Sequence, residues 1–125
     1  MTAAGALWVF LGGGIGSVLR YSLSGWMART ATAFPWPILT ANVIGSLIIG
    51  IIAALIKDRS SVQWLLLVTG VLGGFTTFST FSLDTLTLLQ AGRVSAAAAY
   101  SLGSLALGLI AALVGFKLTL HLIHG

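Results

Sequence analysis

Apolar residues dominate the chain in four long stretches, which are separated by the few charged and turn-forming residues. The stretches cover residues 4–27, 36–56, 62–90 and 94–120. A helix needs about 20 mostly apolar residues to cross the hydrocarbon core of a bilayer, and each stretch has that length. The pattern therefore predicts an all-α membrane protein, with residues 1–125 forming a single domain of four transmembrane helices.

A polar segment interrupts the third stretch in its middle. It runs from Gly73 to Ser82 and places five hydroxyl residues after two adjacent glycines, which disfavours a continuous helix. Broken backbone within a bilayer is tolerated where it is buried or lines a cavity, and its free carbonyls can bind a cation. We therefore expect the third helix to be broken near the bilayer midplane, with the hydroxyl groups forming a polar track.

The composition excludes most other classes of protein. Hydrophobic residues make up 58% of the chain and charged residues only 6%, against about 25% charged in soluble proteins. This excludes a soluble enzyme, a soluble nucleic-acid binder and a disordered chain. The net charge of +4 comes without the basic cluster that nucleic-acid binding requires. The absence of cysteine removes thiol chemistry, and no catalytic constellation is visible in the sequence.

The distribution of Lys and Arg specifies the orientation in the membrane only weakly. Four helices place both termini and the middle loop on one side, which carries Lys57, Arg59 and Lys117, whereas the other side carries Arg29 and Arg93. This near balance fits insertion in both directions with antiparallel pairing. It also fits an orientation that helix packing or another protein sets. Four short helices form a thin bundle, so we expect a pathway to need a second copy.

Three polar side chains inside the stretches need a partner, because lipid offers no hydrogen bonds. Arg20 can snorkel to the interface, pair with another group or attract an anion. Asn42 can join two helices or donate to a ligand. Asp84 is the only acid within a stretch, and we expect it to bond to a nearby Thr or Ser or to pair with a basic residue.

Aromatic and hydroxyl side chains suggest a route for an anion. Phe78 and Phe81 are three residues apart, so they share a face if this segment is helical. Their positive ring edges can contact an anion, although packing in the core also explains them. Tyr100 and Ser104 lie four residues apart on a stripe that includes Gly108, and they should face protein or water.

Three motifs, in order, resemble the CrcB/Fluc family of fluoride channels. Gly12 to Tyr21 is similar to the family's opening Gly-Gly-x-x-Gly-x-x-x-Arg-Tyr, and Thr40 to Ser46, which reads Thr-x-Asn-x-x-Gly-Ser, resembles the family's second-helix element. The segment from Gly73 to Ser82 resembles the signature of the family's broken third helix and is highly specific. Together the motifs cover nearly the whole chain.

The resemblance implies a passive, highly selective fluoride channel and not an enzyme. Such channels are antiparallel dual-topology homodimers in the prokaryotic plasma (inner) membrane. They export fluoride that has entered as HF and become trapped by dissociation, and so lower its toxicity.

The resemblance also implies the site residues. The fluoride pathway would contain Asn42, Phe78, Phe81, Ser79, Thr80, Tyr100, Ser104 and Arg20. The backbone carbonyls of Gly73 and Thr76 would hold a structural Na+ ion at the dimer interface. The sequence departs from the family in two places. Asp84 stands where Glu is common, and Gly108 lacks the hydroxyl that some relatives have there.

Two other functions are compatible with the size and span count. A small proton-coupled multidrug exporter has the same architecture, but it needs a carboxylate in the first helix, and this first helix has none. A non-transporting membrane subunit would conduct no ion and would form a stable complex with another protein.

Overall fold

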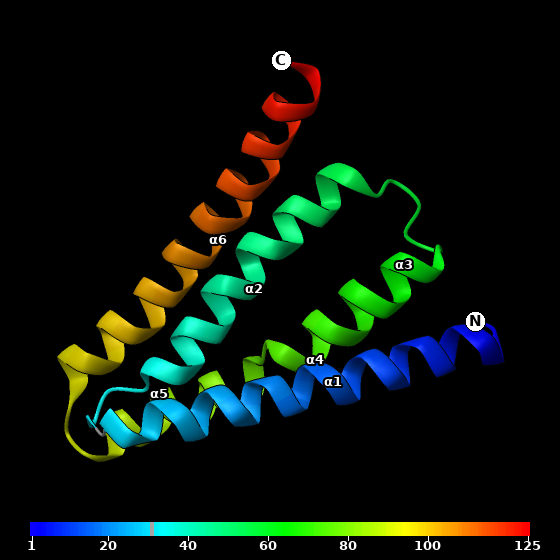
Figure 1. Cartoon of the computed structure of the whole chain (residues 1–125). Helices are drawn as coiled ribbons and strands as arrows, with labels where there is room; N and C mark the ends of the chain where they lie inside the picture. Colours follow the sequence, from blue (N-terminus) through cyan, green and yellow to red (C-terminus); the bar gives the residue numbers. More distant parts are fainter. Residues whose placement is uncertain (31) are drawn as a thin grey trace.

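The computed structural model describes residues 1–30 and 32–125, and all regular elements in that part of the chain are helical (Figure 1). The elements are α1 (Ala3–Met27), the 3-10 helix η1 (Ala28–Thr30), α2 (Trp36–Leu55), α3 (Val62–Trp64), the π-helix η2 (Leu65–Leu72), α4 (Gly73–Phe75), α5 (Phe78–Gln90) and α6 (Val94–His124).

Four helical spans are long and apolar enough to cross a membrane, and α3 to α5 together form the third. This confirms the four predicted transmembrane helices. The fourth helix continues to His124, beyond the predicted end at Leu120. The prediction followed the apolar stretch, whereas a helix can continue into water once it has started. Between α5 and α6 the chain turns at Gly92, whose positive φ of 74° suits a residue without a side chain.

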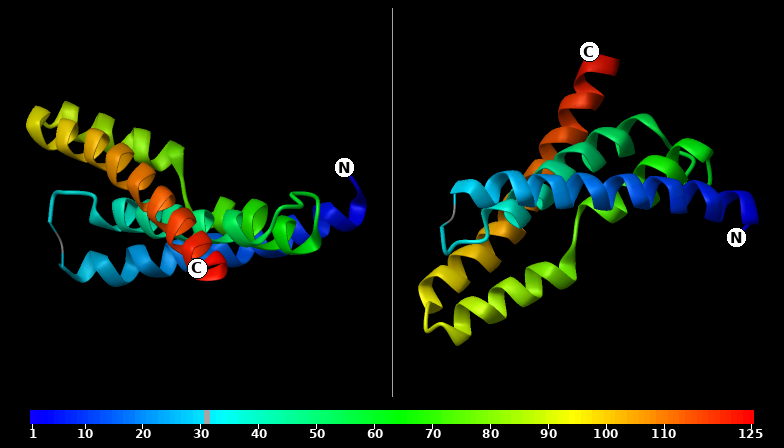
Figure 2. Two further views of the ribbon diagram at one scale, coloured as in Figure 1. Left: turned by 90° about the horizontal axis from the view of Figure 1, so that it is seen from above. Right: turned by 60° about the horizontal axis from the view of Figure 1, so that its bottom comes forward.

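The third helix is broken at Thr76 and Thr77, as the sequence predicts. Thr76 (φ −85°, ψ 156°) and Thr77 (φ −154°, ψ 130°) are both extended, and they lie near the middle of the span Val62–Gln90. The break changes the neighbours of this helix. Before it, η2 and α4 pack along α1, and after it α5 packs on α6. Figure 2 shows α5 beside the first half of α6 and directed away from α1.

Glycines allow α1 and the first half of the third helix to pack backbone against backbone. A Cβ atom on Gly12 would meet the carbonyl oxygen of Leu66 and lie 2.9 Å from the backbone nitrogen of Val71. A Cβ on Gly16 would likewise meet the carbonyl of Val71. On the facing helix, a Cβ on Gly74 would meet backbone atoms of α1. The small residues at four-residue spacing in α1 therefore mark a true helix–helix contact.

The same kind of contact joins α2 and α6, which run parallel to each other. A Cβ on Gly50 would meet the carbonyl of Ala112, and a Cβ on Gly115 would meet the carbonyl of Leu47.

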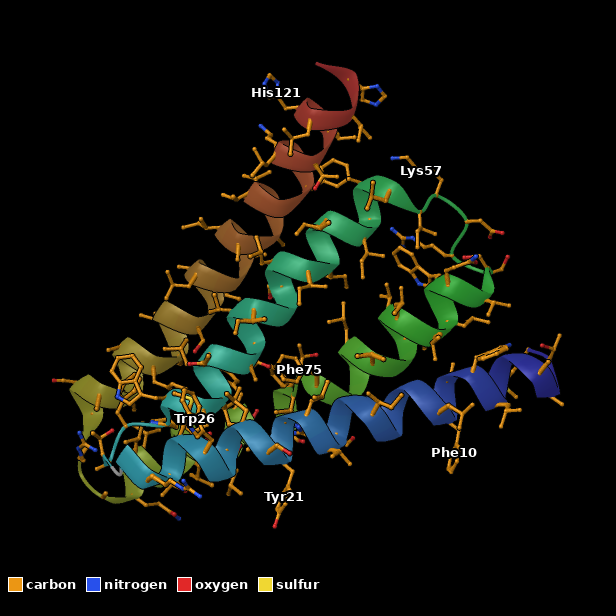
Figure 3. All side chains as sticks on the ribbon, viewed as in Figure 1. Phe10, Tyr21, Trp26, Lys57, Phe75 and His121 are labelled. Carbon is orange, nitrogen blue, oxygen red and sulfur yellow. The ribbon has the colours of Figure 1, made fainter. Side chains whose placement is uncertain are left out.

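A small core cluster lies where α5, α6 and the start of α2 meet, and it contains Ile38, Leu88, Ala97 and Tyr100. Many other large apolar side chains are exposed, as suits contact with lipid or a partner. Figure 3 shows Phe10 and Tyr21 pointing away from the bundle.

Candidate functional site

A groove of about 630 Å³ lies beside the break in the third helix. Residues of α2, of α6 and of the third helix on both sides of the break line it. The lining includes six of the residues predicted for the site: Asn42, Gly73, Thr76, Phe78, Phe81 and Ser104. The fold thus brings together residues that are up to 62 positions apart in the sequence, and it does so at the point where helical backbone is interrupted.

Asn42 bridges α2 to the broken backbone through two hydrogen bonds. Its Nδ2 donates to the carbonyl oxygen of Thr77 at 3.1 Å, and the Thr77 N–H donates to Asn42 Oδ1 at 2.9 Å. The side-chain amide therefore pairs with both polar groups that Thr77 cannot satisfy within a helix. One hydrogen of Nδ2 is left over from this pairing for another acceptor. Of the two interpretations that the sequence left open for Asn42, the structure shows the link between helices.

The break releases the two carbonyl groups predicted to bind sodium. In a continuous helix, the N–H groups of Thr77 and Thr80 would donate to the carbonyls of Gly73 and Thr76. Here the Thr77 N–H donates to Asn42, and the Thr80 N–H donates to Thr77 Oγ1 at 3.2 Å. Gly73 is still helical, in α4, whereas Thr76 is extended. Neutral carbonyl oxygens at an interrupted helix are ligands that suit Na+. The residues present therefore fit such an ion.

Thr77 also organises the start of α5. Its hydroxyl caps the helix by accepting from the Thr80 N–H, and it lies 3.3 Å from Thr80 Oγ1 and 3.4 Å from Ser79 Oγ. Ser79 and Thr80 thus form a hydroxyl cluster with Thr77. Thr77 lines the groove, whereas Ser79 and Thr80 do not. Thr77 was not among the predicted site residues. Its position directly before the second half of the third helix, where a hydroxyl can act as an N-cap, was the available signal.

Three aromatic rings lead from the groove into the core. The ring centres of Phe78 and Phe81 are 5.7 Å apart, and those of Phe81 and Tyr100 are 5.2 Å apart. Phe78 is 79% exposed, whereas Tyr100 is completely buried. Phe78 and Phe81 do share a face, as predicted. Tyr100 lies behind Phe81 in the core cluster and does not line the groove.

The partner of Asp84 is not the one that the sequence suggested. The Tyr100 hydroxyl donates to Asp84 Oδ2 at 3.1 Å, so the partner is neither Thr, Ser nor a basic residue. The two residues are 16 positions apart, and they meet only because α5 and α6 form a hairpin. Sequence spacing within one helix could not reveal this pair.

Ser104 and Arg20 have contrasting surroundings. The hydroxyl of Ser104 is buried, lines the groove and has no hydrogen-bond partner among the residues that the structure describes. Arg20 is half-buried on α1 and lies outside the lining of the groove.

Ser46, which was not among the predicted site residues, lines the groove. A Cβ on Gly108 would lie 3.3 Å from Ser46 Oγ, so the Ser46 hydroxyl occupies the space beside that glycine.

Comparisons with known proteins agree on one family. Residues 7–116 match the family described as "CrcB-like protein, Camphor Resistance (CrcB)". Three similar proteins carry the name "Fluoride-specific ion channel FluC". The protein of Thermus thermophilus is 48% identical over 115 residues, covering 90% of this chain and 91% of that one. That of Rhizobium leguminosarum is 47% identical (88% and 91% covered), and that of Methylobacillus flagellatus is 46% identical (88% and 90% covered).

Proposed function

The chain belongs to the CrcB family of fluoride channels, and from this membership we propose that fluoride leaves the cell passively along the groove beside the helix break. The protein is a multi-pass membrane protein of a prokaryote, with four spans. The observation that carries the proposed pathway is the meeting of Asn42, Phe78, Phe81 and Ser104 in one groove. These residues come from three helices and supply amide, aromatic and hydroxyl groups to a single surface.

The chemistry of the groove suits a small, strongly hydrated anion. Fluoride gives up its water only where protein donors replace it. The unpartnered Ser104 hydroxyl and the remaining Nδ2 hydrogen of Asn42 are such donors, and the positive ring edges of Phe78 and Phe81 add weak contacts. Several weak sites in sequence let an ion enter and leave, as conduction requires. Asp84, the carboxylate nearest to these residues in the sequence, accepts a hydrogen bond from the Tyr100 hydroxyl.

The proposed channel is an antiparallel homodimer. Phe78 is 79% exposed although it lines the groove, which supports a second copy that encloses the pathway. The near balance of Lys and Arg between the two sides supports insertion in both directions.

Dual topology can be tested with a single thiol, because the natural chain has no cysteine. In sealed vesicles, a membrane-impermeant maleimide should label about half of Lys57→Cys if both orientations are populated. Labelling of all or none of the protein would contradict the proposal.

We also propose that the freed carbonyls of Gly73 and Thr76 hold a structural Na+ ion together with the same groups of a second copy. Gly45 offers a way to test this, since its Cβ would meet the Thr76 methyl group. Gly45→Ala should displace Thr76, and we expect fluoride efflux to fall about tenfold, which corresponds to a loss of about 1.4 kcal/mol in Na+ binding. The external Na+ concentration that gives half-maximal efflux should rise.

Gly103→Ala is the matched control, because a Cβ at Gly103 would meet nothing within 4 Å. Equal efflux and equal Na+ dependence in both variants would exclude the assignment of Thr76 to a sodium site.

The decisive experiment on function is efflux from liposomes that contain the purified protein and are loaded with potassium fluoride. Valinomycin carries the counter-ion, a fluoride electrode records release, and a parallel trial uses chloride. Fast release of fluoride without chloride is the expected result. No release of either ion from folded, inserted protein would favour a non-transporting subunit. Proton-dependent export of an organic cation, abolished by Asp84→Asn, would favour a multidrug exporter.

Phe81→Ile tests the role of the aromatic rings in the groove. The substitution keeps a large apolar side chain but removes the ring that contacts both Phe78 and Tyr100. We expect fluoride efflux to fall at least about tenfold. One aromatic contact can supply about 1.4 kcal/mol, and the loss of that energy corresponds to a factor of ten. Phe10→Ile, on the 75% exposed Phe10 of α1, should leave efflux unchanged. A parallel fall in both variants would show a general effect of ring removal.

A further inference from the structure

Basic side chains from two separate segments meet at one end of the bundle. Lys57 follows the end of α2, and its Nζ lies 5.8 Å from the centre of the Phe116 ring on α6. In the same loop, the Arg59 guanidinium lies 5.3 Å from the Trp64 ring. The contact with Phe116 places Lys57 beside the turn of α6 that also carries Lys117. Figure 3 shows Lys57 and His121 at this same end of the molecule.

The end of α6 extends past the apolar part of the bundle. α6 has 31 residues and is therefore about 46 Å long, whereas the hydrocarbon core of a bilayer is about 30 Å thick. α2, with 20 residues, stops at Leu55, and Figure 1 shows α6 continuing beyond that end. Lys117, His121 and His124 lie on one face of this extension, because they are four and three residues apart. Because α6 is longer than the hydrocarbon core is thick, we infer that this face reaches the lipid headgroups.

The cations at this end lack a matching set of carboxylates. Lys57, Arg59 and Lys117 are exposed, and the nearby acid in the sequence is Asp58. Asp58 Oδ1 accepts from the Ser60 N–H at 2.9 Å and from the Ser60 hydroxyl at 2.6 Å. These bonds lower the pKa of Asp58, so it stays ionised, and they hold its Oδ1 against Ser60. One carboxylate is therefore set against the three exposed cations Lys57, Arg59 and Lys117.

We propose that this basic rim, formed by Lys57, Arg59, Lys117, His121 and His124, binds the phosphate of an anionic phospholipid. Each cation near a membrane surface attracts an anionic headgroup, and imidazole can donate to phosphate oxygens. A lipid fits better than a free anion because Phe116 and Trp64 lie directly below the cations. Aromatic rings at this depth are typical of the membrane interface, and here they offer an apolar surface to the glycerol and acyl chains. The proposal does not depend on the ion that the protein conducts.

Native mass spectrometry of the full chain from mixed micelles tests this, with phosphatidylglycerol and phosphatidylcholine supplied in equal amounts. Lys57→Gln combined with Lys117→Gln removes two cations of the rim, and Arg29→Gln combined with Arg93→Gln removes two from the opposite side. Wild type and the opposite-side variant should both keep more bound phosphatidylglycerol than phosphatidylcholine. The rim variant should bind it about 25-fold more weakly, since each cation is worth about a factor of five.

Three outcomes would overturn the proposal. In the first, the rim variant retains phosphatidylglycerol as well as wild type does. In the second, the opposite-side variant loses it equally, which would indicate a general effect of charge. In the third, an excess of inorganic phosphate displaces the lipid from wild type, which would indicate a site for a free anion. Because the lipid preference and the phosphate competition use wild type alone, they remain informative if the rim variant fails to fold.

Discussion

Asn42→Asp is expected to reduce fluoride efflux at least about a hundredfold. The carboxylate cannot donate to the Thr77 carbonyl, so it loses the 3.1 Å bond and places oxygen against oxygen at the break. It also adds a negative charge to the groove. At a separation of about 4 Å and an effective dielectric constant near 20, two like charges repel by about 4 kcal/mol, which is more than enough for a hundredfold effect.

The matched control for this variant is Gln90→Glu. It makes the same change from amide to acid at the exposed end of α5, far along the helix from the break. Size-exclusion profiles and helical content should be the same for both variants and wild type, because α2 itself does not need the Asn42 side chain. Undiminished efflux through folded Asn42→Asp would remove Asn42 from the pathway.

The second large effect is expected on stability, from Gly16→Val in α1. Any Cβ at this position meets the carbonyl oxygen of Val71 and lies 2.8 Å from the backbone nitrogen of Phe75. Backbone atoms cannot rotate away as a side chain can, so the two helices must separate. We expect a loss of at least about 3 kcal/mol, the upper part of the range for overpacking.

Gly14→Val provides a close comparison, because a Cβ at Gly14 would meet nothing within 4 Å. It carries the same cost in intrinsic helix propensity on the same helix. Thermal unfolding in detergent, followed by the loss of the folded peak in size-exclusion chromatography, should therefore separate the two variants. Similar midpoints for Gly14→Val and Gly16→Val would mean that close packing against the third helix contributes little to stability.

Much of the fold could be predicted because it depends on local properties of the chain. The length of each apolar stretch determined the four spans, and two glycines followed by hydroxyl residues indicated the break. The end of α6 was predicted too early, since a helix can outlast its apolar stretch. What could not be predicted is the exchange of neighbours at the break, by which η2 and α4 pack on α1 whereas α5 packs on α6.

The site was predictable in its residue types but less so in its contacts. Asn42 was identified as a polar residue that needs a partner. Its partner Thr77 is 35 positions away, and Asn42 bonds to the backbone N–H and carbonyl of Thr77 rather than to its side chain. Tyr100 was grouped with Ser104 by helical spacing. The structure separates them, because Tyr100 turns into the core toward Asp84 while Ser104 lines the groove. Such differences depend on which helices are neighbours, and a pattern within one helix does not contain that information.

The short connection between α5 and α6 has a consequence for biosynthesis. Only Ala91, Gly92 and Arg93 separate the two helices, and the Asp84 carboxyl on α5 bonds to Tyr100 on α6. A lone carboxyl is costly in lipid, so α5 would enter the bilayer unfavourably if it left the translocon alone. We therefore expect the two helices to leave the translocon together as a hairpin. The groove beside the break would then form only after α6 has been synthesised, because α2, α5 and α6 all line it.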